Sequence, residues 1–168
     1  DAHKADITGI SFSVLDGTAI YVPLKHRSGR NAENQAAIWD YLKLLFESKD
    51  VIKVAHNLAF ESMFLYARGI VLQKPCYDTI AASQLTLKSK WEFRSLADSG
   101  LKTLAPALCK AEMTEFSTVT DGRFFDELNP QDEKTIRYTC ADSDYTLRLY
   151  HVFNQWFDRF LPKHRTIV

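Results

Sequence analysis

Tyr138-Thr139-Cys140-Ala141-Asp142 is the stretch around which the rest of the chain is organised. It lies in a segment that we expect to be helical from about residue 130 to about residue 160, with Pro130 at its first position. Residues four apart share a helix face, so the phenol of Tyr138 should lie beside the carboxylate of Asp142. A carboxylate can bind a hard divalent cation, and a phenol one turn away can hold a water molecule by a hydrogen bond. The pair suits metal-assisted hydrolysis of a phosphate, although a buried tyrosine next to a solvated aspartate has the same spacing.

A second polar stretch, His56-Asn57-Leu58-Ala59-Phe60-Glu61, follows residues 51–55, which are short, β-branched and nearly all apolar. That composition is typical of a buried parallel strand. Residues 58–68 then predict a helix that stops at Gly69. Because ligands of open α/β sheets bind at the carboxyl ends of the strands, this turn is a candidate site. Asn57 is equally suited to capping the helix that follows it.

The N-terminal part of the chain predicts a β-hairpin followed by a helix. Residues 7–14 and 18–22 alternate between apolar and polar side chains, and Asp16-Gly17 between them is a strong turn signal. An amphipathic helix follows, and Asn31 is its expected N-cap.

The remaining segments complete an α/β pattern. We expect a short strand over residues 73–77, and Asp78 and Thr79 as caps of a helix that runs to Leu87. Gly100 and Pro106 predict two short helices, and residues 114–129 predict a loop. The order of elements predicts a mixed β-sheet flanked by helices. It also leaves a gap, because no strand is predicted that would join the hairpin to the two parallel strands.

Composition limits the class of protein. The chain has 168 residues, 46% hydrophobic and 25% charged, with 21 basic and 21 acidic side chains and a formal net charge of +0. This balance argues against a protein that coats nucleic acid by bulk charge, but it leaves room for a local basic groove. Three widely spaced cysteines predict neither a zinc site nor a disulfide framework. No apolar run suits a membrane span, and the widely spaced cysteines favour a reducing, intracellular compartment, so we expect a cytoplasmic protein.

The polar stretches resemble the second and third motifs of the proofreading 3′–5′ exonucleases, most closely the exonuclease domain of family A DNA polymerases, the DNA polymerase I type. Asn57 and Glu61 match the second motif, and Tyr138 and Asp142 match the third. The resemblance covers nearly the whole chain, and it implies a single exonuclease domain over residues 1–168 with an RNase H-like (DnaQ-like) fold. A tyrosine where other members carry a histidine marks the DEDDy subtype.

Two features depart from the family pattern. The first motif, Asp-x-Glu on an N-terminal strand, is absent, and in the family that strand is the centre of the sheet. We therefore expect an N-terminally truncated domain whose parent chain carries the strand and two of four metal-binding carboxylates upstream, or else a compromised form. The second motif usually ends in Asp, whereas this chain has Glu61, which is one methylene longer.

Carried over by motif, the resemblance implies two divalent metal ions, Mg²⁺ or Mn²⁺. Asp142 would bind the water-activating metal, Glu61 would hold the second metal, and Tyr138 would orient the attacking water. Asn57 and Phe60 match family residues that lie near the terminal nucleotide.

Other residues are candidates for contact with the substrate. His56 is a candidate contact for a phosphate, although a histidine with structural hydrogen bonds at a strand end fits as well. Lys102 belongs to a loosely basic stretch with interleaved aromatic residues, which also contains Lys88, Lys90, Trp91, Phe93 and Arg94. This stretch suits guidance of a single strand, and its alternative is an ordinary solvated loop.

The leading interpretation is the proofreading domain of a bacterial or phage family A polymerase. Such a domain acts on single-stranded DNA 3′ ends, releases nucleoside monophosphates and works beside the polymerase domain of the same parent chain. One alternative is a stand-alone exonuclease that acts on RNA, like ribonuclease D. Another is a catalytically inactive domain that only docks DNA. We expect no membrane partner.

Overall fold

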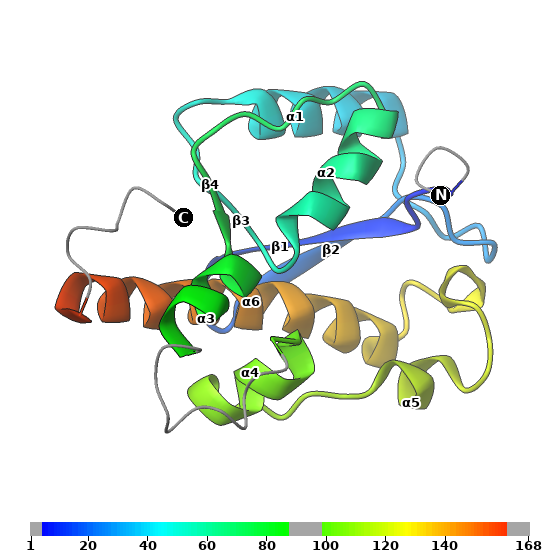
Figure 1. The fold of residues 1–168 in the computed structure, drawn as a ribbon. Helices are drawn as coiled ribbons and strands as arrows, with labels where there is room; N and C mark the ends of the chain where they lie inside the picture. Colours follow the sequence, from blue (N-terminus) through cyan, green and yellow to red (C-terminus); the bar gives the residue numbers. More distant parts are fainter. Residues whose placement is uncertain (1–4, 88–98, 161–168) are drawn as a thin grey trace.

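A computed structural model describes residues 5–87 and 99–160 of the chain. Its elements lie around one long helix, α6 (Figure 1). In order they are β1 (Gly9–Leu15), β2 (Thr18–Pro23), α1 (Gln35–Glu47), β3 (Lys53–Ala55), α2 (Leu58–Ala67), β4 (Cys76–Asp78), α3 (Thr79–Leu87), α4 (Leu101–Cys109), α5 (Phe116–Thr120), a short 3₁₀ turn (Phe125–Glu127) and α6 (Glu133–Phe160).

The strands form two small sheets. β1 and β2 make the predicted antiparallel hairpin, with Gly17 in the left-handed conformation at the turn. β3 and β4 pair in parallel, and Ala55 at the end of one strand faces Asp78 at the end of the other. Within residues 5–87 and 99–160, no strand joins the two pairs, as the sequence predicted.

The main core lies where α3 and α4 meet α6. Leu104, Leu149 and Phe153 are fully buried there. The other buried members of this cluster are Tyr77, Ala82, Leu87 and Phe157. The cluster fixes the central turns of α6, and it therefore fixes the helix face that carries the predicted Tyr138–Asp142 pair.

Helices α1 and α2 lie on the other side of the hairpin and are much less buried (Figure 1). Among the described side chains of these two helices, only Leu42 and Leu65 are buried. Leu44 is 69% exposed and Tyr66 is 66% exposed. This layer contributes little to the main core.

The hairpin is fastened to α6 by a buried carboxylate. The backbone N–H of Gly17 donates to Asp144 Oδ1 over 2.7 Å, and the Arg148 guanidinium lies 2.8 Å from Asp144 Oδ2. These contacts give Asp144 a structural role.

Four local expectations are wrong. Asn31 does not cap α1, because its side-chain amide bonds to both backbone groups of His26 instead. α4 runs unbroken through Pro106, since Leu104 and Ala105 are fully buried against the core. Pro130 is not the first residue of α6. The helix begins at Glu133, and Pro130 lies in the turn before it.

The fourth concerns residues 114–129, which were expected to form a loop. They contain α5 and the 3₁₀ turn. Each element is too short to leave a periodic pattern in the sequence.

Candidate active site

The predicted pair on α6 is present, and a third residue joins it from α4. Tyr138 and Asp142 lie one turn apart on α6, and both are partly exposed. Lys102, in the first turn of α4, places its Nζ 2.9 Å from Asp142 Oδ1 and 4.4 Å from the centre of the Tyr138 ring. The three side chains therefore make one cluster of a carboxylate, an ammonium and a phenol.

Tyr138 is held as a neutral phenol. Partial burial, with smaller contributions from the charges of Asp142 and Glu115, raises its pKa to about 12. The rings of Phe116 and Phe125 each lie 6.1 Å from the Tyr138 ring. Because Phe116 is 49% exposed, an aromatic surface continues from Tyr138 towards solvent.

Asp142 is a partly desolvated carboxylate with one charged partner. Burial raises its pKa, and the hydrogen bond and the charge of Lys102 oppose that rise. A protonated His56 would oppose the rise as well. Among the described residues, Lys102 is the only hydrogen-bond donor to the Asp142 carboxylate.

The turn between β3 and α2 is held by Asp78. Its carboxylate accepts hydrogen bonds from the backbone N–H groups of Asn57 and Leu58, over 3.2 and 2.9 Å, and from that of Ile80 over 2.8 Å. One aspartate therefore caps α2 and α3 together. Its role as a cap for α3 was predicted.

Asn57 occupies the N-cap position of α2 without capping the helix through its side chain. The residue has φ 82°, a left-handed conformation that asparagine tolerates better than most residues. Because Asp78 satisfies the backbone N–H groups, the expectation that Asn57 caps the helix is wrong. Its exposed side chain is left for another partner.

His56 has a structural hydrogen bond. Its Nδ1 lies 2.8 Å from Thr79 Oγ1, and that hydroxyl donates to the backbone oxygen of Ala55. Burial lowers the pKa of His56, while Asp78, the Ser99 backbone and Asp142 partly oppose the change. The imidazole is therefore neutral at pH 7.

Glu61 and Phe60 lie in the first turn of α2. Both side chains reach solvent, and Phe60 is 48% exposed while its ring lies 4.8 Å from that of Phe64. The protein atoms crowded around Glu61 raise the pKa of its carboxyl by desolvation. A second carboxylate is therefore present, on a different element from Asp142.

The described residues do not by themselves complete a metal centre. Within residues 5–87 and 99–160, no three His, Cys, Asp or Glu side chains converge closely enough to hold an ion. Asp142 and Glu61 are the candidate ligands, and Asp142 is already paired with an ammonium. A metal bound here would need ligands in addition to those in the described part of the chain.

Part of the predicted substrate track lies outside the described residues, namely Lys88, Lys90, Trp91, Phe93 and Arg94. In contrast, the contact of Phe116 with Tyr138 was not predicted. Phe116 belongs to a five-residue helix that shows no periodicity, so no signal in the sequence would have indicated it. Among the described residues, no helix is both long enough and apolar enough to cross a membrane.

Sequence comparisons show which known proteins this chain is similar to. A family model described as 3′–5′ exonuclease matches residues 2–157. DNA polymerase I of Pseudomonas aeruginosa is 29% identical over 161 residues, which cover 92% of this chain and 17% of the polymerase. DNA polymerase I of Chloroflexus aurantiacus is 28% identical over 153 residues, which cover 86% of this chain and 15% of the relative. The chain thus spans less than a fifth of these relatives.

Solved structures share the fold. Brucella melitensis NrnC with bound Mg²⁺ superimposes with a TM-score of 0.67 at 20% identity, covering 94% of this chain and 68% of NrnC. NrnC bound to pGG gives a TM-score of 0.59 at 22% identity, covering 86% and 61%. These matches confirm the expected RNase H-like α/β fold. From the family match over most of its length, the chain belongs to the 3′–5′ exonuclease family, of the kind found in family A DNA polymerases.

Proposed function

We propose that this domain is a 3′–5′ exonuclease that hydrolyses the last phosphodiester bond of a DNA 3′ end and releases a nucleoside 5′-monophosphate. The observation that carries the proposal is the Tyr138–Asp142 pair, partly exposed on one face of α6 in a chain that belongs to this family. Such a pair combines a site for cationic charge with a group that can orient water.

Asp142 and Glu61 are the proposed metal ligands of this chain. Carboxylate oxygens are the ligands that Mg²⁺ and Mn²⁺ prefer. Because the described residues supply no third ligand, we propose that an Asp-x-Glu strand upstream of residues 1–168 supplies the rest. Its proposed place is between the two separate sheets. With these ligands the site would bind two divalent ions, which lower the pKa of a bound water and stabilise the leaving oxygen.

Tyr138 orients the attacking water rather than removing its proton. A phenol with a pKa of about 12 stays protonated at neutral pH. It can both donate and accept a hydrogen bond, and its hydroxyl has no partner in the part of the chain that the structure describes.

The end of the DNA strand is held by stacking and by polar contacts. Phe60 and Phe116 each expose about half of their surface, and exposed aromatic rings stack well on single-stranded bases. Asn57, with its side chain free of capping, is the proposed contact to the terminal sugar and phosphate. His56 as a neutral imidazole and Lys102 as a cation are the further proposed contacts to phosphate.

The biological setting follows from the same proposal. The domain would act on mismatched or frayed single-stranded 3′ ends that a polymerase domain of the same parent chain passes to it. This setting is the bacterial or phage-infected cytoplasm. The similarity to DNA polymerase I over 92% of this chain supports it.

The test is degradation of a 3′-labelled single-stranded DNA with Mg²⁺ or Mn²⁺. We would compare the 168-residue chain, a chain extended upstream through the first strand, and Asp142→Ala in the extended chain. Asp50→Ala is the matched control, because Asp50 is exposed and precedes β3, at the opposite end of that strand from His56. The proposal expects activity in the extended chain, its loss in Asp142→Ala and its retention in Asp50→Ala.

The alternatives give different results in the same assay. An extended chain that degrades an RNA oligonucleotide faster than the matching DNA would indicate the exonuclease that acts on RNA. An extended chain that is inert on both, yet still binds DNA, would indicate a docking domain and would overturn the proposed activity.

A further inference from the structure

Lys102 contacts both residues to which the proposed chemistry is assigned. Its Nζ lies 2.9 Å from Asp142 Oδ1 and 4.4 Å from the centre of the Tyr138 ring. The ammonium therefore occupies a position beside Asp142 that a bound cation would also need.

This lysine is presented by a firmly held helix. Leu104 and Ala105, which follow it in α4, are fully buried against the core that includes Leu149 of α6. The side chains of Lys102 and Asp142 are only 28% and 36% exposed. The ion pair is therefore more shielded from solvent than the pair between Arg137 and Glu133 on the same helix, which are 78% and 76% exposed.

The Lys102 ammonium and a divalent ion compete for the Asp142 carboxylate. A magnesium ion binds carboxylate oxygen at about 2 Å. Since the ammonium stands 2.9 Å from Oδ1, the two cations sharing that oxygen would lie at most about 5 Å apart. Like charges at that distance repel each other strongly in a partly desolvated site. Binding of either cation at this carboxylate must weaken binding of the other.

We propose that Lys102 is an internal counter-ion of Asp142, which neutralises the carboxylate in the absence of metal and competes with the divalent ion for it. The inference rests on the proposed role of Asp142 as a metal ligand. It makes Lys102 a positioning residue that sets metal affinity. The flexible four-carbon stem lets the displaced ammonium turn away from Asp142 and become available to a phosphate.

The test uses the chain extended upstream through the first strand, and it measures binding of Mn²⁺ alone, by the loss of the free-ion paramagnetic resonance signal, without any nucleic acid. Lys102→Met keeps an unbranched side chain that is one atom shorter, and it removes the charge. We expect it to bind Mn²⁺ roughly five- to tenfold more tightly than the unaltered chain, as loss of a partly shielded competing charge implies. Asp142→Asn in the Lys102→Met background should abolish the gain, and Lys102→Arg should restore the original affinity.

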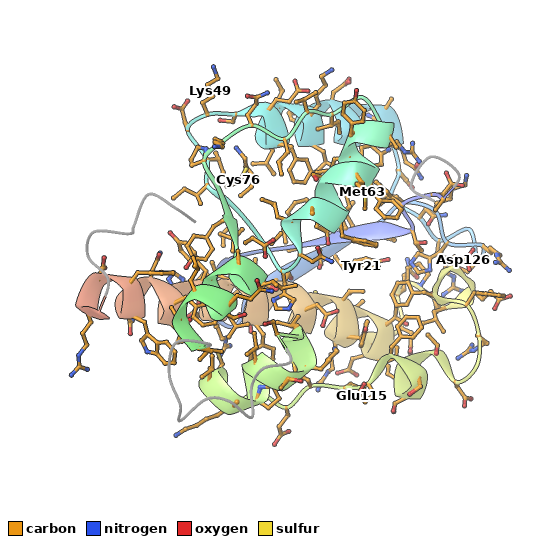
Figure 2. All side chains as sticks on the ribbon, viewed as in Figure 1. Tyr21, Lys49, Met63, Cys76, Glu115 and Asp126 are labelled. Carbon is orange, nitrogen blue, oxygen red and sulfur yellow. The ribbon has the colours of Figure 1, made fainter. Side chains whose placement is uncertain are left out.

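Lys49→Met is the matched control, because it removes the same charge from an exposed lysine near the end of α1, far from α4 (Figure 2). It should leave Mn²⁺ affinity unchanged. Equal or weaker binding in Lys102→Met would overturn the inference, and so would an equal gain in Lys49→Met. If Asp142→Asn alone weakens binding while Lys102→Met has no effect, the inference fails but the proposed role of Asp142 stands.

A second measurement on the unaltered chain guards against misfolding of the variant. The ammonium group of Lys102, labelled with ¹⁵N, should give a resolved hydrogen-bonded signal that is absent in Asp142→Asn. Titration with Mg²⁺ should remove this signal. Its persistence throughout the titration would overturn the competition, because the ammonium would then still hold Asp142.

Discussion

The side of the molecule built from α3, α4 and α6 differs sharply from the side built from α1 and α2. The first side contains three large side chains with no exposed surface, Leu104, Leu149 and Phe153. The second side has one buried residue in each of its helices, Leu42 and Leu65. The same kinds of apolar side chain are present on both sides, so the difference lies in what each helix packs against.

This difference divides the candidate site. Asp142, Tyr138 and Lys102 belong to the well-packed side, whereas Asn57, Phe60 and Glu61 belong to the first turn of α2 and the residue before it. Catalytic geometry depends on side chains held to within fractions of an ångström by their supports. The α2 half is therefore the less constrained half of the site in this chain.

Leucine truncation gives the largest expected contrast between the two sides. Leu149→Ala should lower the free energy of unfolding by about 3 kcal/mol, because it opens a cavity among fully buried side chains. Leu44→Ala, the same change at a side chain that is 69% exposed, should cost less than about 0.5 kcal/mol. Urea unfolding followed by circular dichroism measures both. Equal costs would show that α1 is buried in solution and would remove the contrast.

Asp78 is the expected link between the two sides. Asp78→Ala leaves three backbone N–H groups at the starts of α2 and α3 without their acceptor, and it should cost about 2 kcal/mol. Asp78→Asn keeps one acceptor oxygen and should cost less. Hydrogen exchange should show faster exchange in α2 than in α6 after the change. Uniform acceleration would mean that the two sides unfold as one unit.

Removing the carboxylate that holds the hairpin on α6 should lower the free energy of unfolding by a smaller amount. Asp144→Ala removes the acceptor of the Gly17 N–H and leaves Arg148 without its carboxylate. Because Asp144 is only 8% exposed, we expect a loss of about 1.5 kcal/mol. The comparison variant is Glu133→Ala, which breaks an exposed ion pair with Arg137 and should cost less than about 0.5 kcal/mol. A loss no larger than that of Glu133→Ala would show that the hairpin docks by other contacts.

Acidification provides the smallest and most gradual test. His26 is 3% exposed, and its ring nitrogens bond to the Leu128 carbonyl and the Tyr21 hydroxyl. Burial lowers its pKa, with partial opposition from the Leu128 carbonyl and Asp126. The unfolded chain therefore binds a proton first, and stability falls as pH drops below the ordinary histidine pKa of about 6.5.

The slope of that loss is at most about 1.4 kcal/mol per pH unit for each such histidine. Unfolding by urea at a series of pH values from 7.5 to 5, taken about one unit apart, would measure it. His26→Gln should be less stable at neutral pH and should show a flatter pH dependence. An unchanged slope would assign the effect to other groups, such as His56.

Elements with strong local sequence signals could be predicted from the sequence alone. The Asp16-Gly17 turn, the alternating strands beside it and the spacing of Tyr138 and Asp142 each follow from a short pattern, and each is present in the structure. That no strand of residues 5–87 and 99–160 joins the two sheets could also be predicted, because strands can be counted from the sequence.

Contacts between distant segments could not be predicted in the same way. Nothing near Asp78 indicates that its carboxylate also caps a helix twenty residues earlier, so Asn57 was the natural choice for that cap. Lys102 and Asp142 are forty positions apart, and their pairing depends on how α4 packs on α6. Local patterns specify elements, whereas these contacts depend on tertiary packing.

The hydrogen bond from Gly17 to Asp144 joins two segments that the ribosome makes at different times. Its two residues are 127 positions apart. At roughly 5–20 residues per second on the ribosome, the hairpin is complete roughly 6–25 s before its partner on α6 has been made. During that interval the hairpin lacks the helix on which it packs, so the surface that α6 covers in the folded chain faces solvent or a chaperone. The order of synthesis therefore leaves the hairpin, residues 9–23, open to misassembly until α6 has been made.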